Sequence, residues 1–123
     1  MNVPAHYSPV MPYIVVSNAD DFITFITTVF DAKEILKVPN EDGSVMHAEY
    51  SINGGTVMFG QAGGEWKAFP CGMFVVTENV DRIHERGLAN GATSIQEPGD
   101  RGYGRASGFQ DSFGNQWWLN NPG

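Results

Sequence analysis

The hydrophobic pattern along the chain occurs twice. Short runs of β-branched and aromatic residues over 12–16 and 73–77 are typical of strands. Each run is followed by polar residues that can cap a helix start, at 17–18 in the first half and at 77–79 in the second. The sequence therefore predicts a strand and then a helix near the start of each half.

The stretches after these caps have helical spacing. In the first half the apolar positions are i, i+3, i+4, i+7 and i+8, at Phe22, Phe25, Ile26, Val29 and Phe30. The second half repeats the pattern more weakly, at Val80, Ile83, Gly87 and Leu88. We expect one face of each helix to be buried, and the pair Asn90-Gly91 to end the second helix.

Three further strands complete each half. Turn residues separate the apolar runs, and the strands are expected at about 33–38, 44–52 and 55–60 in the first half and at 93–96, 105–110 and 115–120 in the second. A Gly-rich loop is expected at 99–104. The chain thus reads as an α+β fold of two βαβββ modules, over about 9–60 and about 70–121.

A shift of 60 positions aligns the two halves without a gap. Val15, Val16, Asp21 and Ile23 then coincide with residues of the same type, Val75, Val76, Asp81 and Ile83. This agreement indicates two copies of one supersecondary unit.

Composition and charge restrict the function classes. The 123 residues suffice for one domain, and 41% of them are hydrophobic, enough for a core. The formal charge of −7 and the lack of a basic cluster argue against a nucleic-acid partner. No apolar run is long enough for a membrane helix, so no membrane partner is expected and the predicted location is cytoplasmic. The single cysteine, Cys71, allows no internal disulfide, and we expect it to be an inert apolar residue.

One predicted strand carries a candidate pair of polar residues. His47 and Glu49 alternate with Met46, Ala48 and Tyr50. If the apolar set faces the helices, the polar pair faces the opposite side of the sheet. There it either contacts a ligand or forms hydrogen bonds with neighbours and water on a solvated sheet face. The other two histidines, His6 and His84, are expected on the surface.

Aromatic residues are the other candidate site residues. In the last strand Gln116, Trp118 and Asn120 share one face, which leaves Trp117 on the other. With Tyr13 and Phe109 on the same side as Trp118, this face would suit a flat organic ligand. Two loop aromatics, Trp66 and Tyr103, are expected at its rim. The acidic excess weakly favours a cationic or neutral ligand.

The duplicated pattern resembles the vicinal oxygen chelate superfamily, which includes glyoxalase I, fosfomycin-resistance and bleomycin-resistance proteins and ring-cleaving dioxygenases. The resemblance covers residues 9–121 and rests on three segments, 13–16, 43–50 and 110–118. Within the superfamily, the segment Met46–Glu49 is most similar to the PhnB-like branch. The resemblance implies a cup-shaped half-barrel sheet with the helices on its convex face, and a ligand in the concave mouth near a homodimer interface.

The resemblance also implies four inward positions at which enzymes of this family bind a divalent metal through His and Glu. Carried over one at a time, these positions hold Met11 (or Pro12), Met58, Cys71 (or Gly72) and Trp118. Thioether, thiol and indole groups are poor ligands for a hard cation. We therefore expect no metal, no other cofactor and no glyoxalase I activity.

Two functions remain open. The first is a binding protein without the usual metal site, similar to bleomycin-resistance members, which sequesters a flat aromatic drug or metabolite in the concave cleft of a homodimer. Its expected ligand-binding residues are Tyr13, His47, Glu49, Met58, Trp66, Tyr103, Phe109, Gln116 and Trp118. The second is a superfamily enzyme of lyase, isomerase or dioxygenase type that uses His47 and Glu49, with or without a metal. The missing metal ligands favour the first.

Overall fold

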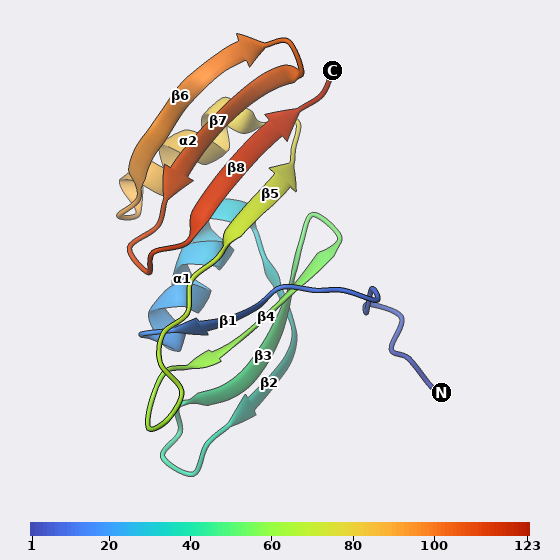
Figure 1. Ribbon diagram of the computed structural model, residues 1–123, viewed down its shortest axis with the longest axis vertical. Coiled ribbons are helices and arrows are strands. Elements are labelled where there is room, and N and C mark those ends of the chain that lie inside the picture. Colours follow the sequence, from blue (N-terminus) through green and yellow to red (C-terminus); the bar gives the residue numbers. More distant parts are fainter.

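The computed structural model describes residues 1–123 and consists of two βαβββ modules (Figure 1), as the sequence predicts. The first module contains β1 (Tyr13–Val16), α1 (Ala19–Phe30), β2 (Lys33–Pro39), β3 (Val45–Ile52) and β4 (Gly55–Gln61). The second contains β5 (Gly72–Val76), α2 (Val80–Ala89), β6 (Thr93–Arg101), β7 (Gly104–Gln110) and β8 (Gln116–Asn121). Neither helix has the length and apolarity needed to span a bilayer.

Each module forms its own four-stranded mixed sheet. The strand order is β1-β4-β3-β2 in the first sheet and β5-β8-β7-β6 in the second. The first strand of each module runs parallel to the last strand, and the remaining pairs are antiparallel. No ladder of hydrogen bonds joins the two sheets, so β1 and β5 are edge strands.

Helix α1 packs against both sheets. The ring of Phe22 contacts Phe59 of the first sheet at a centroid distance of 4.9 Å and Trp117 of the second at 6.5 Å. Phe30 approaches Trp117 more closely, at 4.5 Å. The helical spacing of the phenylalanines thus buries one face, as predicted, and this face forms a single core with residues of both modules.

The hydrogen bonds of the sheets correct the alignment of the two halves. Ile14 pairs with Phe59 in the first sheet, and Met73 pairs with Trp117 in the second, and all four side chains are buried. Equivalent residues of the first strands are therefore 59 positions apart (14 to 73), not 60. The modules are structural repeats, but the identities at a shift of 60 do not join equivalent positions.

The hairpin between β6 and β7 also differs from the expectation. The Gly-rich segment 99–104 was expected as a loop, but Gly99 pairs with Ala106 and Arg101 pairs with Gly104. Only Gly102 and Tyr103 lie between the two strands. Glycine and proline weakened the strand pattern in the sequence, while two register shifts along β6 accommodate them in the sheet.

Candidate ligand-binding site on the first sheet

Each sheet has one face that packs on the helices and one that faces away from them, which we call the open face. On the first sheet Ile14, Ala48 and Phe59 are buried in the core. Their neighbours on the strands, Tyr13 and Met58, lie side by side on the open face. Tyr13 and Met58 therefore both face away from the helices, as predicted.

A β-bulge changes the facing of one residue. In the ladder between β2 and β3, Val38 pairs with His47 and Pro39 pairs with Val45, which leaves Met46 as an extra residue. Val45 is buried, whereas Met46 is half exposed on the open face. The prediction that Met46 faces the helices is therefore wrong, because strict alternation does not hold across a bulge.

A hollow of about 870 Å³ lies at the end of this open face. Its apolar walls are Tyr13, Val15, Met46 and Trp66, and its polar residues include Asn40, Asp42, Ser44 and Gln61. Gly60 is also in the lining, where a Cβ atom would lie 2.6 Å from the carbonyl oxygen of Met46. Since no larger residue fits at this position without a shift, the glycine keeps the hollow open.

Beside the hollow, Glu49 is buried under the segment 4–12, which we call the N-terminal strap. Its Oε1 atom lies 2.7 Å from Nε2 of His6, and its Oε2 atom accepts the hydroxyl of Tyr7 at 2.7 Å. Oε2 also lies 2.8 Å from Nε2 of His47. The carbonyl of His6 accepts the Thr56 hydroxyl at 2.6 Å, so the strap is bonded to two strands of the sheet.

These contacts determine the ionisation of the carboxylate. Burial alone would raise the pKa of Glu49, but the hydrogen bonds from two imidazoles and a phenol outweigh it and lower the pKa to about 2. The same contact with Glu49 raises the pKa of the Tyr7 hydroxyl. Glu49 is therefore a carboxylate at neutral pH, with both oxygens occupied, and its effect is to orient the groups around it.

His47 connects this cluster to the hollow. Its ring stacks on Tyr13 at a centroid distance of 5.6 Å and an interplanar angle of 22°. Its Nδ1 atom lies 3.4 Å from the Tyr13 hydroxyl, while Nε2 is held by Glu49. The structure thus contains the hydrogen bond between His47 and Glu49 that one interpretation of this pair predicts. The other interpretation, ligand contact at His47, is compatible with this bond.

The open face of the second sheet carries the other predicted aromatic residue. Trp118 is half-buried with its ring against Gly108, where a Cβ atom would lie 2.5 Å away, and it pairs with the exposed Phe74. Gln116 is exposed at the start of β8. Tyr103 lies at the β6–β7 hairpin, and its carbonyl accepts the Asn120 amide at 3.2 Å. The hollow beside Tyr13 contains no residue of this sheet, so one chain does not bring the two groups together.

The predicted position of Phe109 is wrong. Phe109 pairs directly with Trp117, and opposite residues of an antiparallel pair share a face. Both are fully buried against the helices. The close approach of α2 explains the packing, since a Cβ atom on Gly87 would lie 2.8 Å from the Phe109 ring.

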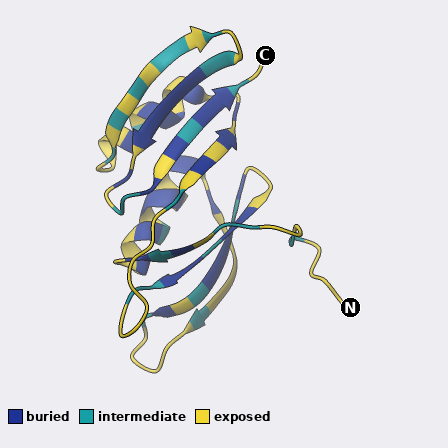
Figure 2. Cartoon of the chain, viewed as in Figure 1, coloured by how far each residue is buried: buried dark blue, intermediate teal, exposed yellow.

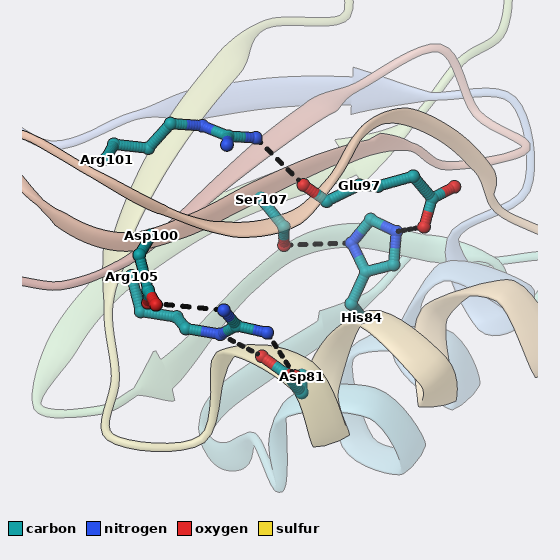
Figure 3. A network of polar contacts seen from close by, with 7 residues as sticks. All are labelled: Asp81, His84, Glu97, Asp100, Arg101, Arg105 and Ser107. Atoms are coloured by element: carbon teal, nitrogen blue, oxygen red, sulfur yellow. Dashed lines mark hydrogen bonds and ion pairs between the residues drawn. The ribbon is translucent and has the colours of Figure 1, made fainter.

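Two histidines predicted on the surface are also placed differently. His6 binds Glu49, as described above. His84 is buried, with Nδ1 2.9 Å from the Ser107 hydroxyl (Figure 3) and Nε2 2.9 Å from the Ser94 hydroxyl. Burial lowers the pKa of His84, although nearby carboxylates act in the opposite direction. Leu88, expected in the core, is partly exposed instead. No local pattern around His84 indicated that it is buried between two serines, because Ser94 and Ser107 lie on other elements.

The same view shows an ion-pair network on the second module. Arg105 contacts Asp81 at 2.7 Å and Asp100 at 3.2 Å, which joins the start of α2 to β6 and β7 (Figure 3). These groups are partly exposed, so they tie elements together and contribute little stability individually. They lie on the second module, apart from the hollow of the first.

The side chains at the family's metal positions do not fit a divalent metal. Met58 and Trp118 offer a thioether and an indole, which are poor ligands for a hard cation. The carboxylate paired with Met58, that of Glu49, already has both oxygens bonded to His6, Tyr7 and His47. No group of three His, Cys, Asp or Glu residues is arranged to hold an ion. Burial, and then the nearby Asp111, raise the pKa of Cys71, which disfavours the thiolate that metals bind.

Three comparisons place the chain among known proteins. An uncharacterized protein of Mycobacterium bovis is 33% identical over an alignment that covers 90% of this chain and 81% of the relative. The crystal structure of TioX from Micromonospora sp. ML1 is similar with a TM-score of 0.77 and 23% identity, over 94% of this chain and 99% of that one. PhnB protein from Bacillus cereus is similar with a TM-score of 0.70 and 16% identity, over 93% and 99%.

Both solved structures, one of which is a PhnB protein, share the fold of this chain. The family model matches almost the whole chain, from residue 5 to residue 119. The chain belongs to the Glyoxalase/Bleomycin resistance protein/Dioxygenase superfamily.

Proposed function

We propose that this protein binds a flat aromatic small molecule in the hollow on the open face of the first sheet. The observation that carries the proposal is the group of exposed side chains around this hollow, in which Tyr13, Met46 and Trp66 are each more than half exposed. Exposed apolar side chains that gather around one hollow, rather than singly, are typical of ligand-binding sites. A volume of about 870 Å³ also lies in the range of small-molecule sites.

The proposal includes a homodimer. On the edge strand β5, Phe74 and Val76 are 65% and 58% exposed, and exposed residues alternate with buried ones along this strand (Figure 2). An exposed apolar edge strand is usually covered in a stable protein. A second copy would cover it and could bring Trp118 of one chain towards the hollow of the other. Light scattering at tens of micromolar tests this, and a monomeric mass would contradict it.

Ligand binding in this proposal does not use the superfamily's four-ligand metal. The support is the chemistry of Met58 and Trp118 at two of the four positions. Elemental analysis of protein purified without chelators is the test. One tightly bound transition-metal ion per chain would contradict the proposal.

Quenching of tryptophan fluorescence tests the binding site itself. The probes are acridine and N-methylacridinium at pH 8, and at least one of them should quench with saturation. Trp66→Ala should weaken binding by about 0.5–1.5 kcal/mol, the range for one aromatic stacking contact. Trp66→Phe retains the aromatic face and serves as the control. Trp118→Ala should weaken binding only if the second chain contributes to the site.

A second candidate is an enzyme in which His47 transfers a proton. The observation in its favour is that Glu49 holds Nε2 of His47 at 2.8 Å, an arrangement that fixes the imidazole for acid-base work. Since Glu49 stays ionised, the proton-transfer group would be His47. Assays for lyase, isomerase and dioxygenase turnover would decide. A turnover abolished by His47→Ala and unaffected by Trp66→Ala would favour the enzyme.

A further inference from the structure

We infer that the ligand of this hollow carries a positive charge, which Asp42 holds at the rim while Tyr13 and Trp66 contact the aromatic part. The inference rests on the proposed function and specifies the class of ligand, an aromatic organic cation. It follows from the charge, the geometry and the aromatic content of the lining.

The lining has one charged group. Of the eleven residues around the hollow, only Asp42 has a side chain that is charged at neutral pH, and none is a lysine, arginine or histidine. Lys67 follows Trp66 in the chain but does not belong to the lining. A phosphate or carboxylate group in this hollow would therefore meet a like charge with no counter-charge beside it.

Asp42 is held with one oxygen free. Its Oδ1 atom accepts both the backbone N–H of Ser44 at 2.9 Å and the Ser44 hydroxyl at 2.6 Å. The amide of Asn40 donates to the same hydroxyl at 2.9 Å, which fixes the turn. These bonds use only Oδ1, so Oδ2 remains available to a ligand without rearrangement of the turn.

The hydrogen bonds from Ser44 also lower the pKa of Asp42, so it is a carboxylate at neutral pH. The rim therefore presents a fixed negative charge. The formal charge of −7 on the whole chain adds a field of the same sign.

The walls favour a cation as well. Tyr13 and Trp66 are 53% and 71% exposed, so both rings retain surface for a ligand, although His47 stacks on one face of Tyr13. A cation near the face of an aromatic ring is stabilised by about 0.5–2 kcal/mol. The thioether of Met46 is a polarizable wall that suits a flat ring system. Charge at the rim and π faces along the walls together select an aromatic cation over a neutral molecule of the same shape.

The test compares two probes that differ in charge and by one methyl group. N-methylacridinium is a permanent cation, and acridine is neutral at pH 8. We expect the cation to bind on the order of tenfold more tightly, a difference of about 1.4 kcal/mol. The preference should decrease as NaCl is raised, because the rim is exposed to solvent. Equal affinities for the two probes, with saturable binding of both, would overturn the inference and leave the proposed function intact.

A substitution of Asp42 tests whether this residue causes the preference for the cationic probe. Asp42→Asn retains an oxygen that accepts the bonds from Ser44, but removes the charge. It should reduce the affinity for N-methylacridinium by the same order of magnitude and leave that for acridine unchanged. Glu85→Gln is the matched control, since it removes one exposed carboxylate from α2 on the second module. If Glu85→Gln weakened cation binding as much as Asp42→Asn, only the overall charge would matter and the assignment to Asp42 would be wrong. Binding of neither probe would overturn both the inference and the proposed function.

Discussion

His6 and Glu49 are 43 positions apart in the chain, yet His6 Nε2 and Glu49 Oε1 lie 2.7 Å apart. This contact holds the N-terminal strap against the middle of a strand. It also removes from water a carboxylate that would otherwise be exposed on an open sheet face, since Glu49 is only 1% exposed. The strap is therefore part of the folded domain.

The first prediction concerns Glu49→Gln. The amide cannot accept bonds at both ends as the carboxylate does, so at least one donor from the strap or from His47 loses its partner. The variant should lower the free energy of unfolding by about 1–3 kcal/mol, the usual cost of an unpaired buried polar group. Urea denaturation measures the change. Glu41→Gln, in the exposed turn after β2, is the control and should have little effect.

Amide hydrogen exchange gives a second measure of the same variant. The backbone N–H groups of Tyr7 and of neighbouring strap residues should exchange faster in Glu49→Gln, while those of α1 should not. If the variant were destabilised with no change in the strap, the role assigned to the contact with His6 would be wrong.

The second prediction is the acid response. The folded-state pKa of Glu49 is about 2, below the ordinary value of 4.5. A carboxylate with a depressed pKa contributes stability that is fully present above pH 4.5 and is lost as the pH falls towards 2. The difference in unfolding free energy between the wild type and Glu49→Gln should therefore shrink over this window. A difference that is constant from pH 6 to pH 2.5 would contradict the shifted pKa.

The third prediction concerns His84, whose contribution to stability is also lost as the pH falls, but at a higher pH than that of Glu49. Burial lowers the pKa of His84 below 6.5. The contribution of neutral His84 is therefore present above pH 6.5 and is lost as the pH falls below it. The comparison is between wild type and His84→Gln, since both proteins share the remaining histidines. The stability advantage of the wild type should be smaller at pH 5.5 than at pH 8, and a larger advantage at pH 5.5 would refute the direction of the shift.

The fourth prediction tests the packing of α2 on the second sheet. Gly87→Ala places a methyl group 2.8 Å from the Phe109 ring, so the ring or the helix must move. Overpacking of this kind costs about 1–3 kcal/mol, more than the gain in helix propensity. Gly102→Ala is the control, because a Cβ atom there meets nothing within 4 Å. Thermal unfolding of the two variants should separate them, and a stabilised Gly87→Ala would show that the helix can move away.

The architecture could be predicted because the strand and helix patterns are local. The spacing of Phe22, Phe25 and Phe30 specifies a buried helix face wherever the partners lie. The facing of residues along strands was predictable only where alternation is unbroken. It succeeded for Trp117 and Trp118. It failed at Met46, where a bulge reverses the order, and at Phe109, whose facing is fixed by its cross-strand partner Trp117.

The site was harder to predict because it depends on contacts distant in sequence. Tyr13 and Trp66 were expected near one pocket, and the structure places both around the same hollow. Nothing local to His6 indicated a bond to Glu49, because the strap has neither strand nor helix periodicity. The rim residue Asp42 looked like an ordinary turn residue, since its neighbours Asn40 and Gly43 suit a turn with or without a ligand.

The position of α1 has a consequence for how the two halves depend on each other. Phe22 contacts both Phe59 and Trp117, so the same ring completes the interior of each module. An isolated first half would leave Phe22 and Phe30 partly in water, and an isolated second half would leave Trp117 uncovered. We therefore expect the duplicated units to unfold together in one cooperative transition, and neither fragment alone to be a stable domain.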